Sequence, residues 1–420
     1  MPMSDATQPP PAPLRSSLHS PARAAVIGCG GMGRTHVHAL ATLPAVTLVG
    51  IADVLPANLA RAGDEAGLPA GARYLDAQRL LDKARPDFVV IATQAPQHAA
   101  LTIAAAERGI HILCEKPLAL NLAEADAMLA ACAQHGVLLA VNHLRRVTPA
   151  SSVGRDLIAA GAIGEILAVD IHDKGGRPVG NTLMEMATHY FDEARFLLSR
   201  TRLGEAGHGG AERGDGHGHD LRADEVEWLF ARLTTGLSAA AHAAMPAEIV
   251  PSQVAKPTDR DCGLVLGERG TVVIGLAGGV QAVARFHNLP QADARYDGID
   301  VIGAEGALAV RGGMVKRLFR RRGHTFAEHD PWQPVELPGH DDYFAQTDRT
   351  AGRYLCQQMA LDLIAAVREG RPHVASGRDG LVALELLMAT YASHRRNAPV
   401  SLPLADRRHP LEVWQQEAAR

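Results

Sequence analysis

The chain has 420 residues, of which 47% are hydrophobic and 21% charged, and its formal net charge is -4 at pH 7. This composition suits a globular protein with one or two sizeable cores, without the basic character expected of a protein that binds nucleic acid or anionic membranes. Five scattered cysteines without a CxxC pair suit the reducing cytoplasm. The sequence contains no stretch of about 18 apolar residues, so no membrane span is predicted. Residues 1–22 are rich in Pro, Ser and Ala but lack the apolar core of a signal peptide, which predicts a disordered tail.

From residue 23 to residue 145, short β-branched runs alternate with Ala- and Leu-rich helical stretches. This alternation is typical of repeated strand-helix-strand units and predicts a parallel sheet. The expected strands span residues 25–27, 46–53, 88–93, 111–115 and 137–141.

From residue 146 to residue 420 the pattern changes and predicts an α+β domain. An amphipathic stretch at 152–160, a strand at 166–172 and a helix at about 182–198 come first. Successive strands without a long helix between them then indicate a mostly antiparallel sheet. These strands are expected at 226–233, 237–242, 264–266, 271–274, 280–286 and 299–302, and two helices at about 354–369 and 379–395 follow.

Two polar segments of the second half have ordinary interpretations. The Gly- and His-rich stretch 204–220 is expected to be a surface loop, and no metal site is predicted there because its glycines offer no preorganised geometry. The basic residues Lys316, Arg317, Arg320, Arg321 and Arg322 are interpreted as solvated or subunit-contact surface, in preference to a phosphate or acidic-sugar site.

A glycine-rich turn follows the first expected strand. Gly28, Gly30 and Gly33 form a GxGxxG pattern at the start of a helix, and Gly31 and Met32 lie within the same turn. In dinucleotide-binding proteins such glycines allow a tight turn, close approach to a pyrophosphate and close packing of the helix, whose N-terminus attracts the pyrophosphate. The turn therefore predicts an NAD-binding Rossmann domain over residues 23–145.

Asp53 ends the second expected strand, twenty residues after Gly33. An acidic side chain at this position accepts hydrogen bonds from the adenosine ribose and repels a 2′-phosphate. Since no Arg or Lys follows before Arg61, the sequence favours NAD over NADP. The alternative interpretation is that Asp53 only caps the next helix.

Thr93, at the end of the third expected strand, and Pro96 and His98 just after it lie at the edge where a parallel sheet of this kind binds its ligand. Thr93 and Pro96 are expected to border the cofactor. His98 is a candidate for the same role, and the alternative is that it is only a polar residue at the start of the next helix.

Glu115 and Lys116 precede Pro117 after the next strand, and both are expected to contact the cofactor. The chain holds five lysines against 37 arginines, so a lysine here is an unusual choice. Because an amine can change its pKa and donate a proton, Lys116 is a candidate catalytic group. The alternative is an ordinary exposed Lys-Glu pair in a loop.

The helix at about 182–198 places Glu185, His189 and Asp192 in one stripe, at positions i, i+4 and i+7. A carboxylate one turn from an imidazole can orient it and raise its basicity, as a general base requires. The alternative is a surface helix with a polar pair.

Together these segments resemble the Gfo/Idh/MocA oxidoreductases, which act mostly on sugars and polyols with NAD or NADP. The resemblance covers about residues 23–410 and rests on the glycine turn, Glu115-Lys116-Pro117, Arg145-Arg146 before Pro149, and residues 161–166, 303–306 and 409–411. It implies a Rossmann domain followed by a domain with a large open antiparallel sheet. It also implies an active site between the two domains and a homodimer or homotetramer formed through that sheet.

In this family a Lys of the EKP motif and a helix bearing Asp-x-x-x-His act on the substrate hydroxyl, which implies catalytic roles for Lys116 and His189. Glu185 stands where that Asp usually stands, and its longer side chain leaves open whether its carboxylate contacts substrate or orients His189. His143 lies in a segment that the family often writes with an aromatic residue, and is a candidate for the substrate pocket. Further candidates for contacts with the substrate are Arg146, Lys174 and Asp192.

The leading hypothesis is an NAD-dependent dehydrogenase of a sugar, sugar derivative or cyclic polyol, in which His189 takes the hydroxyl proton and Lys116 stabilises the oxygen. One alternative is an NAD-dependent glycosidase that oxidises its substrate, eliminates the aglycone and reduces the product back, as some members of the family do. Another is a non-catalytic dinucleotide-bound sensor, against which the presence of both Lys116 and His189 argues. The expected partner is a small carbohydrate or polyol, with no nucleic acid and no membrane.

Overall fold

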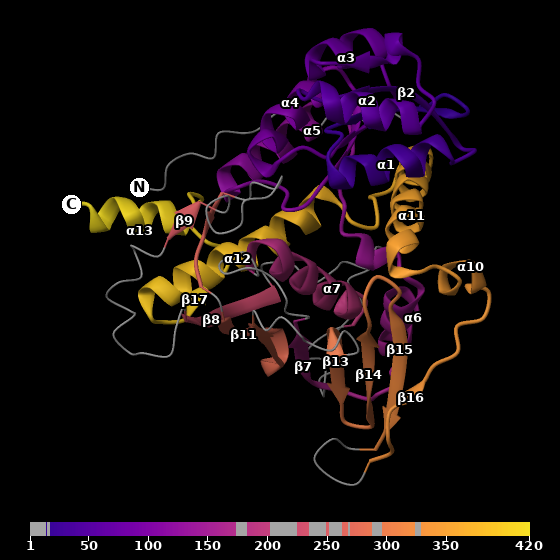
Figure 1. Ribbon diagram of the computed structural model, residues 1–420. Coiled ribbons are helices and arrows are strands. Elements are labelled where there is room, and N and C mark those ends of the chain that lie inside the picture. Colours follow the sequence, from indigo (N-terminus) through magenta and orange to yellow (C-terminus); the bar gives the residue numbers. More distant parts are fainter. Residues whose placement is uncertain are drawn as a thin grey trace.

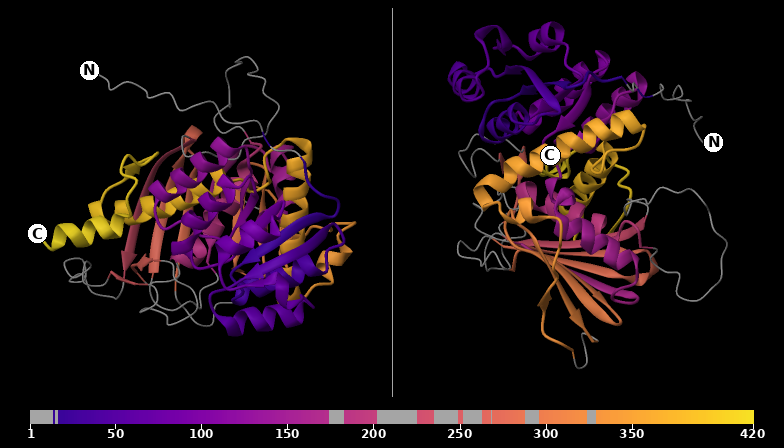
Figure 2. Two further views of the ribbon diagram at one scale, coloured as in Figure 1. Left: turned by 90° about the horizontal axis from the view of Figure 1, so that it is seen from above. Right: turned by 90° about the vertical axis from the view of Figure 1, so that its right-hand side faces the viewer.

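The computed structural model describes Leu14 and residues 17–173, 183–201, 225–234, 249–251, 263–267, 269–287, 296–323 and 329–420. Lys174, the stretch 204–220 and the expected strand at 237–242 lie outside these residues. The described chain forms three tiers: a parallel-sheet domain, a middle layer of helices and a large second sheet (Figure 1; Figure 2, right).

The first sheet has six strands in the order β3-β2-β1-β4-β5-β6, and all neighbouring strands are parallel. The strands are β1 (Ala22–Ile27), β2 (Val46–Ala52), β3 (Arg73–Tyr74), β4 (Phe88–Ile91), β5 (His111–Cys114) and β6 (Leu139–Val141). All five strands expected from the sequence form, and only the two-residue β3 is additional. The strand order reverses between β1 and β4, which is the crevice where such sheets bind ligands. The Rossmann architecture is confirmed.

Helices join these strands and cover both faces of the sheet. They are α1 (Gly31–Ala41), α2 (Pro56–Glu65), α3 (Ala77–Ala84), α4 (His98–Glu107) and α5 (Leu122–His135), with 3₁₀ turns η1 (Ala70–Ala72) and η2 (Ala95–Gln97). Strand β4 is buried along its whole length, as the continuous apolar run Phe-Val-Val-Ile of a doubly covered parallel strand requires.

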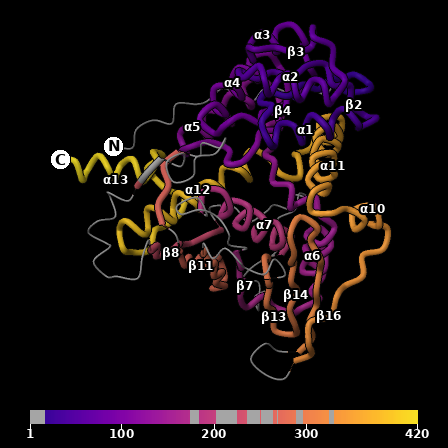
Figure 3. Tube along the Cα trace, in the orientation of Figure 1, coloured from indigo at the N-terminus to yellow at the C-terminus, as the bar shows by residue number. Residues whose placement is uncertain are grey.

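Helix α11 (Asp348–Glu369) comes from far along the chain and packs against α1 (Figures 1 and 3). Its Leu355, Met359 and Leu363 are buried in the same apolar cluster as Val26 and Val37. The second half of the sequence therefore also supplies part of the cover of the parallel sheet.

The second sheet has nine strands in the order β16-β15-β14-β13-β7-β12-β11-β8-β17. Only β7 and β12 are parallel, and the other neighbouring pairs are antiparallel, which confirms the mostly antiparallel sheet. Its strands are β7 (Ile166–His172), β8 (Val226–Thr234), β11 (Arg269–Leu276), β12 (Gln281–Phe286), β13 (Gly298–Gly303), β14 (Gly306–Arg311), β15 (Arg317–Arg322), β16 (Gln333–Pro334) and β17 (Val400–Ser401). A separate pair consists of β9 (Val250–Pro251) and β10 (Leu264–Val265).

The middle layer packs on the face of this sheet that looks toward the first domain (Figure 2, right). Its helices are α6 (Pro149–Ala159), α7 (Thr188–Leu198) and α12 (Gly377–Arg396). Shorter elements are η3 (Leu144–Val147), η4 (Leu183–Ala187), η6 (Ala277–Gly279) and α10 (Asp341–Phe344), and α13 (Pro410–Ala418) lies near the C-terminus. Helix α7 is buried from residue 190 to residue 198, and it packs against α6, α12 and strands β7 and β13 of the second sheet.

Two expectations for the second half are wrong. The helix expected at about 182–198 is not uniform, because Leu183–Ala187 forms a π-turn and the α-helix begins only at Thr188. The wider π-turn removes the regular α-helical spacing between Glu185 and His189. In addition, Lys316 is only 1% exposed, so the basic run is not solvated at that residue.

Candidate active site

The glycine turn after β1 has the shape that a dinucleotide requires. Gly28 adopts a φ of 91°, and a Cβ atom there would lie 2.6 Å from the main chain of Ala92. A Cβ atom on Gly33 would lie 1.8 Å from the Gly28 carbonyl oxygen. Gly30 and Gly31, by contrast, have no atom within 4 Å of a Cβ position, and no side chain caps the start of α1. This open helix N-terminus fits a pyrophosphate.

Asp53 lies directly beside this turn. Its Oδ2 accepts a hydrogen bond from the Cys29 N–H at 2.6 Å, and its Oδ1 accepts one from the Leu55 N–H at 2.8 Å. Helix α2 has its N-cap at Leu55 and no side-chain cap, so the interpretation of Asp53 as a helix cap is wrong. Val54, Leu55 and Leu75 are 81%, 56% and 57% exposed next to it, and sequence reasoning did not single them out.

His98 joins the loop after β4 to the loop after β5. The buried ring has Nδ1 2.9 Å from the carbonyl oxygen of Pro117 and Nε2 3.3 Å from that of Thr93. Burial lowers the pKa of His98, so the ring is neutral and donates to only one of these oxygens. Thr93 and Pro96 are half-buried in the loop after β4, and Met32 is half-buried in the first turn of α1.

Glu115 is buried at the end of β5 and uses both carboxylate oxygens within the protein. Oε1 lies 2.9 Å from His36 Nε2 and accepts a hydrogen bond from Asn142 Nδ2 at 2.7 Å, while Oε2 accepts one from the Lys116 N–H at 3.2 Å. Burial alone would raise the pKa of Glu115, but the hydrogen bond and charge of His36 lower it to about 2. Glu115 is therefore a carboxylate at neutral pH.

Lys116 reaches the helix that carries His189. Its Nζ donates a hydrogen bond to the main-chain carbonyl of Glu185 at 2.9 Å. In a regular α-helix that carbonyl would accept the N–H of His189, but it lies in the π-turn η4 and accepts from Lys116. The Glu185 side chain is buried, whereas those of Lys116 and His189 are half-buried. The structure thus brings the Lys116 side chain to the turn that directly precedes the helix of His189.

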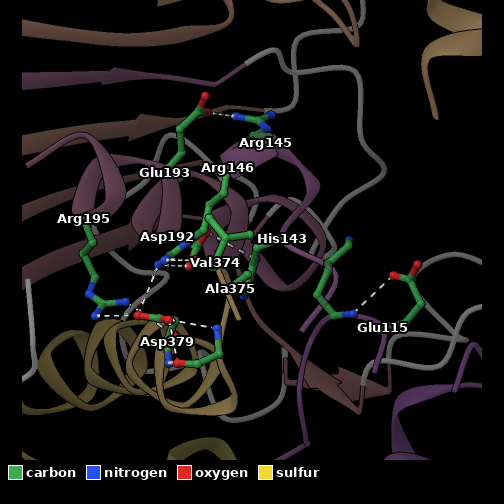
Figure 4. A network of polar contacts seen from close by, with 12 residues as sticks. Glu115, His143, Arg145, Arg146, Asp192, Glu193, Arg195, Val374, Ala375 and Asp379 are labelled. Atoms are coloured by element: carbon green, nitrogen blue, oxygen red, sulfur yellow. Dashed lines mark hydrogen bonds and ion pairs between the residues drawn. The ribbon is translucent and has the colours of Figure 1, made fainter. Parts of the chain in front are cut away.

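Two consecutive arginines of η3 bind two consecutive carboxylates of α7 (Figure 4). Arg145 Nη1 donates to Glu193 Oε2 at 2.9 Å, and Arg146 donates from Nε and Nη2 to the two Asp192 oxygens, each at 2.8 Å. All four side chains are buried. Because the two carboxylates point in different directions from the helix, the two ion pairs fix its rotation.

Asp192 also lies close to His143. Its Oδ2 is 3.8 Å from His143 Nδ1, and the rings of His143 and His189 stand edge to face with centroids 6.2 Å apart. Burial lowers the pKa of His143 although the Asp192 charge opposes it, so the imidazole is neutral at pH 7. Asp192 thus lies close to an imidazole from a different element than its own helix.

A second buried group of charges lies behind α7. Lys316 Nζ is 3.6 Å from Asp297 Oδ1, which also accepts a hydrogen bond from Tyr190 Oη at 2.6 Å and lies 3.7 Å from Arg145 Nη2. Burial lowers the pKa of Lys316. No sequence signal separated this lysine from the arginines that follow it.

These features define a class of protein. A glycine turn open at a helix N-terminus, with an aspartate beside it, fits a dinucleotide. A lysine and two imidazoles near the carboxyl edge of the same sheet are groups that can handle a substrate proton. Together they indicate a dinucleotide-dependent oxidoreductase.

Comparisons with known proteins agree with this class. Residues 22–143 match the model of the GFO_IDH_MocA family, an oxidoreductase family with an NAD-binding Rossmann fold. The chain is 30% identical over 385 residues to a D-apiose dehydrogenase of Paraburkholderia graminis, which covers 90% of this chain and 89% of that protein. It is 32% identical over 196 residues to the scyllo-inositol 2-dehydrogenase (NAD(+)) of Bacillus subtilis, or 44% of this chain and 57% of that protein.

The fold also matches solved structures. Levoglucosan dehydrogenase in complex with NADH and levoglucosan matches with a TM-score of 0.69 at 22% identity, over 91% of this chain and all of that chain. The chain belongs to the Gfo/Idh/MocA family of oxidoreductases and is an enzyme of the sugar and polyol dehydrogenase type.

Two further observations concern the described residues alone. None of their helices combines the length and apolar character needed to cross a bilayer. In that same part of the chain, no three His, Cys, Asp or Glu side chains gather closely enough to hold a metal ion.

Proposed function

We propose that the protein oxidises a hydroxyl of a sugar, sugar derivative or cyclic polyol with NAD as cofactor. The observation that carries this proposal is the 2.9 Å hydrogen bond between Lys116 Nζ and the Glu185 carbonyl, because it brings the lysine after β5 to the helix of His189. The names of the relatives, which are dehydrogenases of D-apiose and scyllo-inositol, support the substrate class.

The first domain offers sites for the pyrophosphate and the adenosine of NAD. The N–H groups at Gly30 and Gly31 face the pyrophosphate, and Asp53 accepts hydrogen bonds from the adenosine ribose. The exposed side chains of Val54 and Leu55 lie against the adenine. When bound, NAD supplies the hydride acceptor of the reaction.

The residues of the chain handle the oxygen and its proton. His189 accepts the hydroxyl proton as general base, and Lys116 hydrogen-bonds the same oxygen and stabilises the negative charge that develops on it. The neutral His143 is 2% exposed and stands edge to face with His189, so it supports the orientation of that imidazole. Arg146 and Asp192, which are both 1% exposed and paired with each other, hold α7 and His143 in place.

The test is NADH formation by the purified protein with a panel of sugars and inositols at alkaline pH. With an active substrate, Lys116→Met and His189→Asn should each lower kcat by about 10²- to 10⁴-fold. The matched control is Lys83→Met, because Lys83 is an exposed lysine of the same domain and should leave kcat unchanged. Full activity of Lys116→Met would refute the assigned role.

A second candidate function is the NAD-dependent glycosidase, and the observation that favours it is the second imidazole, His143, 6.2 Å from His189. Two imidazoles can serve as separate acid and base when a bond to an aglycone is broken. Release of the aglycone from aryl glycosides without accumulation of NADH would support this function over the dehydrogenase.

We also propose a homodimer or homotetramer formed through the face of the nine-stranded sheet away from the helices. Phe230, Val273 and Val283 are half-buried cross-strand neighbours on β8, β11 and β12. Light scattering after size exclusion tests this, since Val273→Arg should reduce the assembly to smaller species. A monomeric wild-type protein would refute it.

A further inference from the structure

The His36–Glu115 pair connects the start of the dinucleotide-binding domain to the candidate catalytic lysine. His36 lies on α1, the helix that begins at the glycine turn, and its Nε2 is 2.9 Å from Glu115 Oε1. Asn142, next to His143 in the chain, donates to the same oxygen, and the Cys356 sulfur of α11 lies 3.9 Å from the His36 ring. Four separate segments therefore meet around the His36–Glu115 pair.

The pair is charged and shielded from solvent. His36 is 1% and Glu115 6% exposed. Burial would lower the pKa of His36, but contacts with the Cys356 sulfur and the Glu115 carboxylate raise it to about 10. A buried ion pair held by further hydrogen bonds tolerates little displacement, because moving either partner leaves an uncompensated charge in a medium of low polarity.

The other oxygen of Glu115 acts on Lys116 itself. Oε2 accepts the main-chain N–H of Lys116, and the side chain of that residue reaches the Glu185 carbonyl. A chain of contacts thus runs from α1 through Glu115 to the Lys116 main chain and on to the π-turn that precedes His189. Both Glu115 oxygens have partners inside the protein and the residue is only 6% exposed, which leaves Glu115 poorly placed to bind the cofactor.

We propose that His36 and Glu115 are positioning residues that tie helix α1 to the main chain of Lys116 and thereby set where its ammonium group meets the substrate oxygen. The proposal rests on the role of Lys116 in the proposed function. It assigns to Glu115 an action through Lys116, in place of the direct cofactor contact expected from the sequence.

The kinetic test compares Glu115→Gln with the wild type and repeats the substitution in the Lys116→Met background. Glu115→Gln should lower kcat about ten- to a hundredfold, because a displaced reacting group is costly, while the Kd for NADH stays within about threefold. In the Lys116→Met background the same substitution should change kcat by less than about twofold. A large rise in the Kd for NADH would overturn the proposal. So would an equally large decrease in kcat when Glu115→Gln is introduced into Lys116→Met.

The matched control is Glu385→Gln. Glu385 is a buried carboxylate that is 2% exposed and paired with Arg407 at 2.6 Å, outside the candidate site. Its substitution removes a comparable ion pair, so it should lower stability and leave kcat unchanged. If Glu385→Gln lowered kcat as much as Glu115→Gln, general destabilisation would explain both.

A second readout does not depend on turnover and so separates this proposal from the proposed function. The chain has only five lysines, so reductive methylation with ¹³C-formaldehyde yields few NMR signals, and Lys116→Met assigns the one of interest. The Lys116 signal should move in Glu115→Gln and His36→Gln but not in Glu385→Gln. An unmoved signal would overturn the positioning role, whereas a moved signal without turnover on any substrate would refute only the proposed function.

Discussion

Removal of the Arg146 charge should destabilise the second domain, because it leaves a buried carboxylate without its bidentate partner. Arg146 is 1% exposed, binds both oxygens of Asp192 at 2.8 Å and lies 3.3 Å from Asp379 Oδ1. Breaking such a pair from one side costs about 3–5 kcal/mol. Arg146→Met keeps the apolar stem of the side chain and removes the charge. The expected loss of stability therefore comes from the uncompensated buried charges of Asp192 and Asp379. Adding Asp192→Asn should recover about 2 kcal/mol of this loss, because the neutral amide no longer leaves a buried charge uncompensated at that position.

Tryptophan fluorescence in urea measures this effect on the relevant domain. All three tryptophans, Trp228, Trp332 and Trp414, lie in the second half of the chain. With a slope of about 2 kcal/mol/M, the Arg146→Met midpoint should fall by about 2 M, and the double variant should regain about 1 M. If the two single effects simply add, with a coupling below about 0.5 kcal/mol, the two residues do not act as a buried ion pair and the reasoning is refuted.

Two further outcomes follow from the first domain. Gly33→Ala should weaken NADH binding by at least about tenfold in a fluorescence titration, because its Cβ would lie 1.8 Å from the Gly28 oxygen, while Gly71→Ala, with no atom within 4 Å, should bind as the wild type does. The stability lost in His36→Gln should depend on pH. The folded-state pKa of His36, about 10, is above the unfolded value of about 6.5, so its contribution is complete below pH 6.5 and vanishes as pH rises to 10. Melting curves of both proteins at several pH values test this, and a constant difference would contradict it.

The strands of the first sheet could be predicted because each is a short apolar run that is buried on both faces, as in Phe88–Ile91. Strands β14 and β15 were missed. In β15, Leu318 is buried among arginines that are exposed or half-buried. Residues 317–322 therefore lack the regular alternation of apolar and polar residues that predicts a strand. The π-turn was missed for a different reason, since the sequence around Glu185 is compatible with an ordinary α-helix.

In the candidate site, too, some features could be predicted from the sequence and others could not. Gly28, Gly33 and Asp53 were correctly placed around one turn because they act through local backbone geometry. The partners of Lys116 and Asp192 were not foreseen. Lys116 binds a main-chain carbonyl, and Asp192 approaches His143. A spacing pattern on one helix cannot reveal a partner on another element.

The sequence by itself determined the order of elements, the glycine turn and the residue types available for chemistry, because these depend on interactions over a few residues. The tertiary structure decided which of those residues meet. The contacts of Lys116 with Glu185, of His36 with Glu115 and of Arg146 with Asp192 span 69, 79 and 46 residues. Such pairs depend on how α1, α7 and the loops between them pack. This packing decides which charged side chains are buried as ion pairs and which remain at the surface.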